Sequence, residues 1–533
     1  MGCTRPTIQE EAPSAWRPAG CFDLEKILIA NRGEIAVRVM RACRELGLRS
    51  VAVFSECDRT ALHVRYADEA YAIGPNPAAE SYLRIDRLID VARKASAEAV
   101  HPGYGFLAEN AAFAAACRDA GLTFIGPSPK VIALMGSKTE ARRVAQHAGV
   151  PVVPGTESLP ATASDESVSA RAAEVGYPLL VKAVAGGGGK GMRGVETPDH
   201  LLPALRTARS EAQSSFGDPA VYFERRLERP RHIEVQLLGD DYGTVLPFVE
   251  RECSIQRRHQ KLIEETPSIA VSRTLREAIT SAAARVAREV GYTNAGTIEF
   301  LLDGKDDRFY FLEMNTRLQV EHPITEMVTG VDLVAAQIAI ARGGRLALDP
   351  RRLLTPEGHA IECRVYAEDP DAGFMPSPGR ITRLQAPAGP GVRDDSGAVS
   401  GSDIPIFYDS LVSKVATSGA ERPAALARMA RALAEYEIQG VRTTIPFFRW
   451  ILQDADFQAG RFDTTFVDRV LERRGSQALT RVPVDSGTIA AIAVALQALD
   501  GIGGGQEQAG TSQAPDGWRR RAREEALRDW PTA

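Results

Sequence analysis

The sequence predicts an α/β protein of several domains, and two patterns carry this prediction. Residues 26–55 contain an apolar run, a turn at Asn31-Arg32-Gly33, apolar residues at helical spacing and a second apolar run, which is typical of a strand–helix–strand unit. Similar alternation continues to about residue 137. With 533 residues, 44% of them hydrophobic, the chain can form roughly two to four domains with real cores. We therefore expect an N-terminal doubly wound α/β domain followed by others.

A helix is expected from Ser137, because Ser137 and Glu140 match an S-x-x-E capping box before the segment ARRVAQHAGV. Lys138 falls in its first turn, where the helix dipole disfavours a cation. An anionic ligand at Lys138 and a solvated lysine both explain this placement.

A glycine-rich segment follows a strand that contains a lysine. Lys182 lies in the apolar run PLLVKAV, and Gly186, Gly187, Gly188, Gly189, Lys190 and Gly191 come shortly after it. Glycines let backbone N–H groups approach phosphate oxygens, and a buried lysine needs an anion. The segment is not a P-loop, because G-x-x-x-x-G-K-[ST] is not met and no helix is expected after it. A phosphate-binding loop and a flexible turn are the two interpretations.

The segment AGTIEFLLDGKDDRFYFLEMN predicts a hairpin with a polar turn at residues 303–307. Symmetric pairing would place Glu299 directly opposite Glu313, where like charges repel. A divalent cation would turn this repulsion into binding, with Asn315 as a third oxygen ligand, and such donors suit Mg²⁺ or Mn²⁺. The alternative is a one-residue shift of register that separates the two acids.

Polar residues then alternate along the chain, at Glu313, Asn315, Arg317, Gln319 and Glu321. In a straight strand they would share one face, with the two glutamates roughly 26 Å apart. A shared site therefore requires the chain to bend, and His322-Pro323 is expected to end the strand. The alternative is a solvated sheet face.

A third group of charges lies in ERECSIQRRHQKLIEETPS, where basic residues gather at Arg251, Arg257, Arg258, His259 and Lys261. Together with the glycine loop and the paired acids, these residues suit ATP, metal ions and a small anionic acceptor. Phosphoryl transfer depends mostly on positioning and charge neutralisation, so this set fits that chemistry.

The remaining features narrow the class of protein. A net charge of −5 and a pI near 6.0 argue against a nucleic-acid binder. The seven cysteines show no metal-ligand spacing, so reduced thiols are expected. Neither a signal-like segment nor an apolar run of about 18 residues occurs, so no membrane association and a cytoplasmic location are expected.

Taken together, six segments resemble biotin carboxylase, the ATP-grasp component of biotin-dependent carboxylases. They occur in order between about residues 24 and 470: ANRGEIA, HPGYGFLAEN, GGGGKGMR, ERECSIQRRHQK, EMNTRLQVEHPITE and ECRVYAEDP. The resemblance implies an N-terminal doubly wound α/β domain, an ATP-grasp domain with a mobile glycine-loop lid, and a C-terminal α+β lobe. The expected boundaries are a disordered tail at 1–22, domains at 23–137, 138–345 and 346–470, and a linker with a charged tail at 471–533.

The resemblance also implies a two-step reaction with MgATP, containing Mg²⁺ or Mn²⁺. Bicarbonate attacks the γ-phosphate to give carboxyphosphate, and its CO₂ is captured by the ureido nitrogen of biotin, which is the first half-reaction of an acyl-CoA carboxylase.

Individual residues match functional positions of that family. The positions that hold ATP are matched by Lys138, Lys182, Gly186–Gly189, Gly191, Glu224, Leu227, His232, Gln256, His259 and Lys261. The metal ligands are matched by Glu299, Glu313 and Asn315, and the bicarbonate site by Arg317, Gln319 and Val320. Glu321 matches the base that deprotonates bicarbonate, Arg364 the group that stabilises the biotin enolate, and Tyr104 a residue beside the biotin ring. We count Arg317, Glu321, Arg364 and Lys261 as catalytic.

Two departures from the family bear on partners and nucleotide contacts. Arg225-Arg226 stand where some members have Lys-Tyr, which affects contacts on the adenine side. None of the eight Met residues is followed by Lys, so the biotin-bearing Met-Lys-Met segment is not met. We therefore expect a separate biotin carboxyl carrier protein or domain. The resemblance also implies a carboxyltransferase subunit and a homodimer.

Three other interpretations remain at this point. The chain could be another ATP-grasp ligase, including a carbamoyl-phosphate-forming one, or a catalytically silent scaffold. It could also be a piece of a longer carboxylase rather than a subunit. The acyl-CoA that the complex carboxylates is not specified by this chain.

Overall fold

The computed structural model describes residues 24–160, 162–184, 192–304 and 307–479, together with residues 491, 492 and 494. The described residues as far as Leu479 belong to one unit, and the fold below is that of this unit. The glycines expected to bind phosphate and the expected tail at 1–22 lie outside the described residues.

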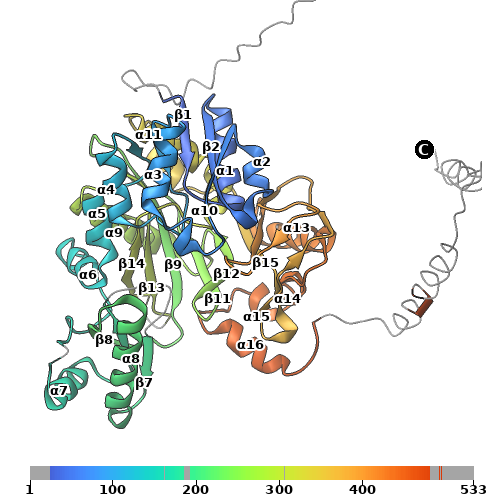
Figure 1. Ribbon diagram of the computed structural model, residues 1–533. Coiled ribbons are helices and arrows are strands. Elements are labelled where there is room, and N and C mark those ends of the chain that lie inside the picture. The colour runs from blue at the N-terminus through green and yellow to red at the C-terminus, as the bar shows by residue number, and fades with distance from the viewer. Residues whose placement is uncertain are drawn as a thin grey trace, which may run out of the picture. The chain divides into compact units, whose positions relative to one another are not determined.

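The N-terminal region is built on a parallel sheet in the order β3-β2-β1-β4-β5, shown in blue in Figure 1. The strands β1 and β2 are almost entirely buried, as their apolar runs predict. The doubly wound domain is thus confirmed. Its strands are β1 (Lys26–Ile29), β2 (Arg49–Ser55), β3 (Glu69–Gly74), β4 (Ala99–His101) and β5 (Thr123–Phe124). Its helices are α1 (Gly33–Glu45), α2 (Leu62–Tyr66), α3 (Ile85–Lys94), α4 (Ala111–Asp119) and α5 (Pro129–Gly136).

His101, at the end of β4, is a fully buried histidine in this domain. The backbone N–H of Gly103 donates to its Nδ1 at 3.0 Å. Burial lowers the pKa of His101 from 6.5 to about 4, and the charge of Arg38 acts in the same direction.

His101→Gln should remove part of the acid sensitivity of folding. Because the folded-state pKa of His101 is about 4, the unfolded chain binds the extra proton between that value and 6.5. The contribution of His101 to the free energy of unfolding is fully present above pH 6.5 and declines as the pH falls from 6.5 to about 4. Between pH 7.5 and pH 5, the wild type should therefore lose about 2 kcal/mol of unfolding free energy relative to the variant, because about 1.5 pKa units of the window lie above pH 5. Urea unfolding of both proteins at pH 7.5 and pH 5 tests this, and an equal pH dependence would contradict it.

The next region begins with α6 (Lys138–His147), whose N-cap is Ser137, so the predicted start of the helix is confirmed. The predicted capping box is wrong, because Ser137 makes no side-chain capping hydrogen bond. Its hydroxyl lies 3.4 Å from that of Thr139, and the carboxylate of Glu140 pairs with Arg143 one turn further on. The local ion pair has replaced the reciprocal cap.

A small antiparallel sheet in the order β7-β6-β8 carries the strand lysine, Lys182. A strand, not a helix, follows the glycine segment, as predicted. The elements of this part are α7 (Asp165–Val175), β6 (Leu179–Ala183), β7 (Met192–Val195), α8 (Leu201–Phe216) and β8 (Val221–Arg225), drawn in green in Figure 1.

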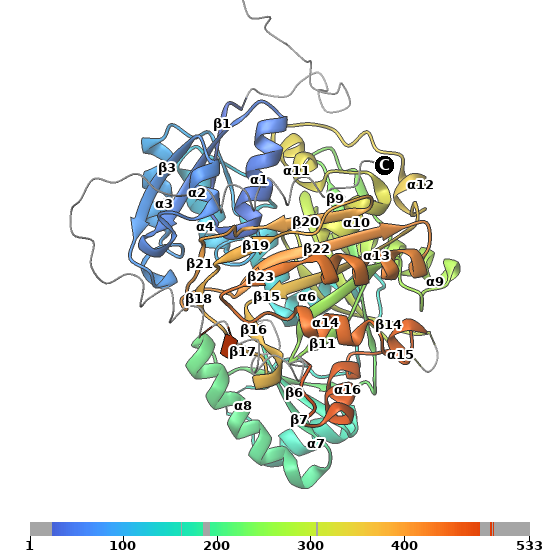
Figure 2. The same ribbon diagram turned by 90° about the vertical axis from the view of Figure 1, so that its right-hand side faces the viewer.

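The central feature is a nine-stranded sheet with the path β14-β13-β9-β11-β12-β15-β22-β20, and β10 pairs with β9 beside it. Figure 2 shows its C-terminal strands β15, β22 and β20 side by side. Because β12 pairs with β15, the sheet runs without interruption across the boundary that we expected near residue 345. Its strands are β9 (Arg231–Gly239), β10 (Val245–Pro247), β11 (Arg251–Arg257), β12 (Gln260–Thr266), β13 (Asn294–Leu302), β14 (Phe309–Asn315), β15 (His359–Tyr366), β20 (Val392–Ser396) and β22 (Leu411–Gly419).

Helices and short strands complete the unit. The helices are α9 (Arg273–Glu289), α10 (His322–Thr329), α11 (Leu333–Ala341), α12 (Pro350–Leu353), α13 (Arg422–Glu435), α14 (Ile445–Ile451), α15 (Ala455–Gln458) and α16 (Phe466–Arg474). The short strands are β16 (Glu368–Asp369), β17 (Met375–Pro376), β18 (Gly379–Arg380), β19 (Arg383–Gln385), β21 (Asp403–Ile404) and β23 (Glu437–Gln439). Short 3-10 helices lie at Glu56–Asp58, Ala78–Glu80, Pro198–His200 and Pro370–Ala372. Since α16 extends to Arg474, it crosses the boundary that we expected at residue 470.

Two further findings concern cysteines and apolar helices. Within the described residues the cysteines are free thiols, as expected: Cys43, Cys57, Cys117, Cys253 and Cys363. In the same part of the chain no single helix has the length and apolar character needed to cross a membrane. Among these residues, α10 and α11 have the required length and apolar character when they are taken together, but a bend of 95° lies between the two helices.

Candidate active site

The alternating segment after β14 is bent, as predicted. The strand ends at Asn315, and α10 begins at His322, so residues 316–321 form a loop and the five polar residues do not share a sheet face. The expectation that His322-Pro323 ends the strand is wrong, because Pro323 lies in the first turn of α10. Proline suits that position, since its ring presets the backbone of a helix and no N–H is needed there. The bend brings the end of the segment back toward the sheet.

The two hairpin acids are directly opposite each other, because Glu299 on β13 pairs with Glu313 on β14. The predicted register is thus confirmed, and the shifted alternative is excluded. A bulge follows immediately, between Glu299 and Phe300. Burial raises the pKa of Glu313, and the charge of Glu299 raises it further. These hard oxygen donors on facing strands suit a divalent cation, which would relieve the repulsion.

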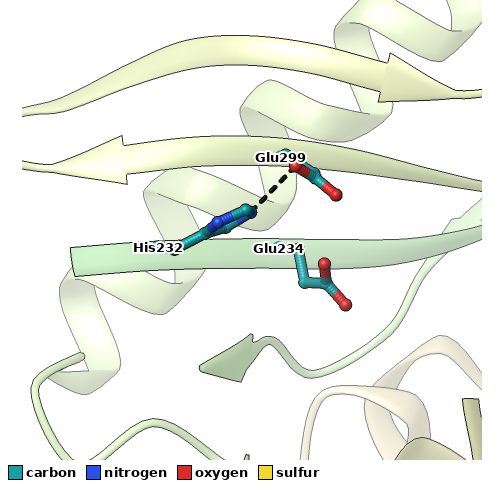
Figure 3. Close-up of side chains that lie close together, drawn as sticks. All are labelled: His232, Glu234 and Glu299. Carbon is teal, nitrogen blue, oxygen red and sulfur yellow. Dashed lines mark ion pairs between the residues drawn. The ribbon is translucent and has the colours of Figure 1, made fainter. Parts of the chain in front are cut away.

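Glu299 is also held by cations and an amide. Lys261 Nζ lies 2.8 Å away, His232 Nε2 lies 2.9 Å away, and Asn315 donates at 2.9 Å. Figure 3 shows His232 on β9 directed at Glu299, with Glu234 two residues further along the same strand. Although burial opposes the charged form, Lys261 and His232 outweigh it and hold the pKa of Glu299 well below its usual range. Burial likewise disfavours the charged form of His232, but Glu299 raises its pKa.

Lys261 is the hub of the site. Its ammonium contacts the carboxylates of Glu234, Glu299 and Glu321 at 2.6, 2.8 and 2.7 Å. Burial would lower its pKa, but the three carboxylates raise it well above the usual value. Gln256 on β11 lies opposite Lys261 in the register of the sheet. Three carboxylates thus share the three N–H donors of Lys261, and a phosphate would have to displace one of them to bind this lysine.

Glu321 is fully buried between two cations from different strands. Lys261 on β12 contacts its Oε1, and Arg364 on β15 donates to its Oε2 at 2.8 Å. Burial opposes its charge, but Lys261, Arg364 and Arg251 outweigh burial and hold the pKa of Glu321 well below its usual range. Arg364 also donates to Glu264 at 2.6 Å. Glu321 is therefore an ionised carboxylate that could accept a proton.

Arg317 holds the other end of the loop. Its guanidinium donates to Glu109 at 2.8 Å, to the side-chain oxygen of Gln319 at 3.0 Å and to that of Asn315 at 3.1 Å. Gln319 in turn donates to Glu299 at 3.4 Å. Arg317 thus points along the loop toward the acid pair, and its fork geometry suits a small planar anion.

A second group of residues lies on the side expected for the nucleotide. Lys182 forms a buried ion pair with Glu224, which also accepts from Arg142 at 2.8 Å. The anion that a buried lysine requires is therefore supplied here by Glu224. Burial lowers the pKa of Lys138, while the nearby Glu313 raises it.

The structure thus joins eight of the predicted residues in one polar network. Hydrogen bonds and ion pairs connect Arg317, Asn315, Gln319, Glu299, His232, Lys261, Glu321 and Arg364. Outside this network, Lys182 pairs with Glu224, Leu227 is half-buried, and His259 is exposed in the turn between β11 and β12. Val320 and Tyr104 are linked to the site through Lys414, which donates to the carbonyl of Val320 and lies 5.7 Å from the Tyr104 ring.

Sequence reasoning missed the carboxylates that orient these cations. Glu234 binds Lys261 and Arg251, Glu109 binds Arg317, and Glu264 binds Arg364. One signal was available: after Arg231, the strand alternates His232, Glu234 and Gln236 with apolar residues, which is unusual for a buried strand. Glu109 gave no such pattern.

Comparison with known proteins agrees with this geometry. Residues 23–132 match the biotin carboxylase N-terminal domain, residues 137–349 the ATP binding domain of the carbamoyl-phosphate synthase L chain, and residues 362–469 the biotin carboxylase C-terminal domain. A pyruvate carboxylase subunit from Methanothermobacter thermautotrophicus is 54% identical over 457 residues, covering 86% of this chain and 91% of the relative. Biotin carboxylase 1 of Bacillus subtilis is 51% identical over 445 residues, covering 84% and 98%.

Solved structures show the same similarity. The biotin carboxylase domain dimer of Hydrogenobacter thermophilus 2-oxoglutarate carboxylase, in complex with MgADP, ADP and bicarbonate, has a TM-score of 0.81 and 48% identity, covering 85% of this chain and 98% of that one. Campylobacter jejuni biotin carboxylase, in a β,γ-ATP complex, has a TM-score of 0.81 and 45% identity, covering 84% and 99%. Domain matches along most of the chain, close relatives and a polar network of this composition lead to one conclusion: this chain belongs to the biotin carboxylase family.

Proposed function

We propose that this protein carboxylates biotin on a separate carrier, using ATP and bicarbonate, and so performs the first half-reaction of an acyl-CoA carboxylase. The observation that carries the proposal is the position of Glu321. It is a buried, ionised carboxylate between Lys261 and Arg364, and the loop that bears it also bears Arg317. An anion binder, a base and a metal-binding acid pair are thus joined in one network.

Glu299, Glu313 and Asn315 are the residues that would hold the metal. The bound ion would neutralise charge on the ATP phosphates. Lys182, Lys138 and Lys261 bring further positive charge to the same side, and His232 orients Glu299. Positioning and charge neutralisation of this kind account for most of phosphoryl-transfer catalysis.

Arg317 and Gln319 hold bicarbonate, and Glu321 removes its proton, so that the bicarbonate oxygen attacks the γ-phosphate and ADP leaves. The product, carboxyphosphate, breaks down to CO₂ and phosphate, the phosphate takes the proton of the ureido nitrogen of biotin, and that nitrogen captures the CO₂. Arg364 stabilises the negative charge of the biotin enolate, and Tyr104 lies beside the ring. Arg364 contacts Glu321 directly, so one pair of residues links the two steps.

The partners in this proposal are a second copy of this chain, a biotin carboxyl carrier protein or domain, and a carboxyltransferase subunit. The relatives include individual subunits of carboxylases, and one solved relative is a dimer. None of the eight Met residues of this chain is followed by Lys, which supports a separate carrier. Free thiols at the described cysteines fit a cytoplasmic location.

Bicarbonate-dependent ATP hydrolysis, measured with and without free biotin, tests the proposal. Biotin should stimulate the wild type, and Arg317→Ala should raise the KM for bicarbonate by about 10–100-fold, since a charge-assisted contact is lost. Arg118→Ala is the control, because Arg118 is exposed and pairs with the neighbouring Asp119. Turnover independent of biotin would indicate another ATP-grasp ligase, and no turnover despite MgATP binding would indicate a scaffold.

A further inference from the structure

Lys414 is a fully buried lysine that touches the proposed bicarbonate loop from the C-terminal part of the large sheet. It lies on β22, between β15 and β20 in Figure 2, and its residue is 1% exposed. Its Nζ donates to the carbonyl of Val320 at 2.9 Å. A second interaction is the ion pair with Glu34 of α1 at 3.2 Å. A buried ammonium is costly unless such partners offset its desolvation, so this placement needs a reason.

The register of the sheet pairs Lys414 with Arg364. These residues are directly opposite each other on β22 and β15, so their side chains lie on the same face. Two cations in that arrangement repel each other. The loop separates their contacts, because Arg364 binds the carboxylate of Glu321 while Lys414 binds the carbonyl of Val320. Two neighbouring cations therefore hold two consecutive residues of the loop.

The carbonyl contact fixes the direction of a backbone amide. In a planar trans peptide the N–H points opposite to the C=O, so the Val320 carbonyl on Lys414 sets the direction of the Glu321 N–H. The preceding peptide is set in the same way, because His322 Nδ1 lies 2.8 Å from the carbonyl of Gln319. A carbonyl can only accept, so Nδ1 carries the proton, and the Val320 N–H then points the other way. The N–H groups of Val320 and Glu321 are thus both oriented by side chains outside the loop, those of His322 and Lys414.

The geometry points to Lys414 as a positioning residue for the bicarbonate loop, acting with Arg364 as a two-point clamp on Val320 and Glu321. The identity of the anion in this inference rests on the proposed function. The clamp itself rests on the contacts of Lys414 and Arg364 with the loop. The carboxyl of Glu34 lies 3.2 Å from the Lys414 ammonium, and Asp395, which is opposite Lys414 on β20, adds a second carboxylate. Burial raises the pKa of Glu34 to about 7, so the two carboxyl groups share the role of counter-charge.

The test compares Lys414→Met with a matched buried lysine. Lys26 is 7% exposed, donates to the carbonyl of Ala95 at 2.7 Å and pairs with Glu69 at 2.7 Å, but it lies on β1. Lys26→Met therefore loses the same kinds of contact away from the loop. Lys414→Met combined with Glu34→Gln keeps the site free of an unpaired buried charge if the single variant folds poorly.

Two measurements are made on these full-length proteins. Hydrogen–deuterium exchange of peptides covering residues 316–322 should become faster in both Lys414 variants and not in Lys26→Met. The KM for bicarbonate should rise about tenfold or more, while the KM for MgATP changes by less than about twofold. A general loosening of the fold would instead raise both KM values together.

The two readouts separate the inference from the proposed function. Unchanged exchange in the loop would overturn the clamp, whatever the activity. Faster exchange with an unchanged KM for bicarbonate would overturn its role in positioning the anion. If the wild type showed no biotin-dependent turnover, the proposed function would fail, and the exchange data would still decide whether Lys414 holds the loop.

Discussion

Glu321→Gln should lower the turnover of biotin-dependent ATP hydrolysis by about 10²–10⁴-fold, the usual contribution of a positioned general base. Glutamine has nearly the same shape, so the buried loop should keep its packing. It cannot take a proton from bicarbonate, however, and its amide has only one acceptor oxygen, so either Lys261 or Arg364 faces an NH₂ group in place of a carboxylate oxygen. Steady-state kinetics with bicarbonate and biotin varied separately would measure the loss.

The charges around Glu321 explain why substrate binding should matter to this base. With Lys261 and Arg364 in contact, the pKa of Glu321 is well below its usual range, and such a carboxylate is a weak base. The phosphates of ATP would compete with Glu321 for Lys261. Loss of that cation raises the pKa of Glu321 and makes it a stronger base. The base is thus expected to gain strength when the nucleotide is bound.

Glu250→Gln is the matched control for this experiment. Glu250 is also fully buried, but it pairs with Arg276 through contacts of 2.6 and 2.7 Å, outside the active-site network. Its replacement should leave turnover within about twofold of the wild type, although it should reduce stability. A Glu321→Gln protein that binds MgATP normally and loses less than about tenfold in turnover would show that another group removes the proton.

The sequence predicted the fold class and the acid pair because these depend on local rules. Strand and helix periodicity gave the N-terminal sheet, and symmetry about a short polar turn gave the register of Glu299 and Glu313. The motif-level resemblance placed the remaining site residues in one cleft. The structure joins eight of the predicted site residues in one polar network, while the roles of individual residues remain predictions.

Long-range partners could not be predicted in this way. Glu109 reaches Arg317 across 208 positions of sequence, and Lys414 reaches Val320 across 94. Neither contact leaves a periodic trace near either residue. The continuity of the large sheet through β12 and β15 was missed for the same reason, since strand pairing across 100 residues is not encoded locally. The capping box failed because Arg143, inside the helix, competes for Glu140.

Arg251→Met should destabilise the protein by about 3–5 kcal/mol, the usual cost of removing one partner from a buried ion pair. The guanidinium of Arg251 is fully buried and forms an ion pair with Glu234. It also donates to Thr325 at 2.9 Å, to Gln236 at 3.1 Å and to Thr297 at 3.2 Å. Methionine fills similar space without any of these donors, so several buried acceptors lose a partner and Glu234 keeps only Lys261.

Urea unfolding followed by circular dichroism would measure this cost, with Arg273→Met as the control. Arg273 pairs with Glu277 one turn further along α9, and both side chains are exposed, so water replaces the lost contact and the expected loss is much smaller. Adding Glu234→Gln to Arg251→Met should restore part of the stability, because it removes the carboxylate left without its main counter-charge. If Arg251→Met unfolded within about 1 kcal/mol of the wild type, burial of this ion pair would contribute little, and the position of Glu234 beside Lys261 would have to come from backbone packing alone.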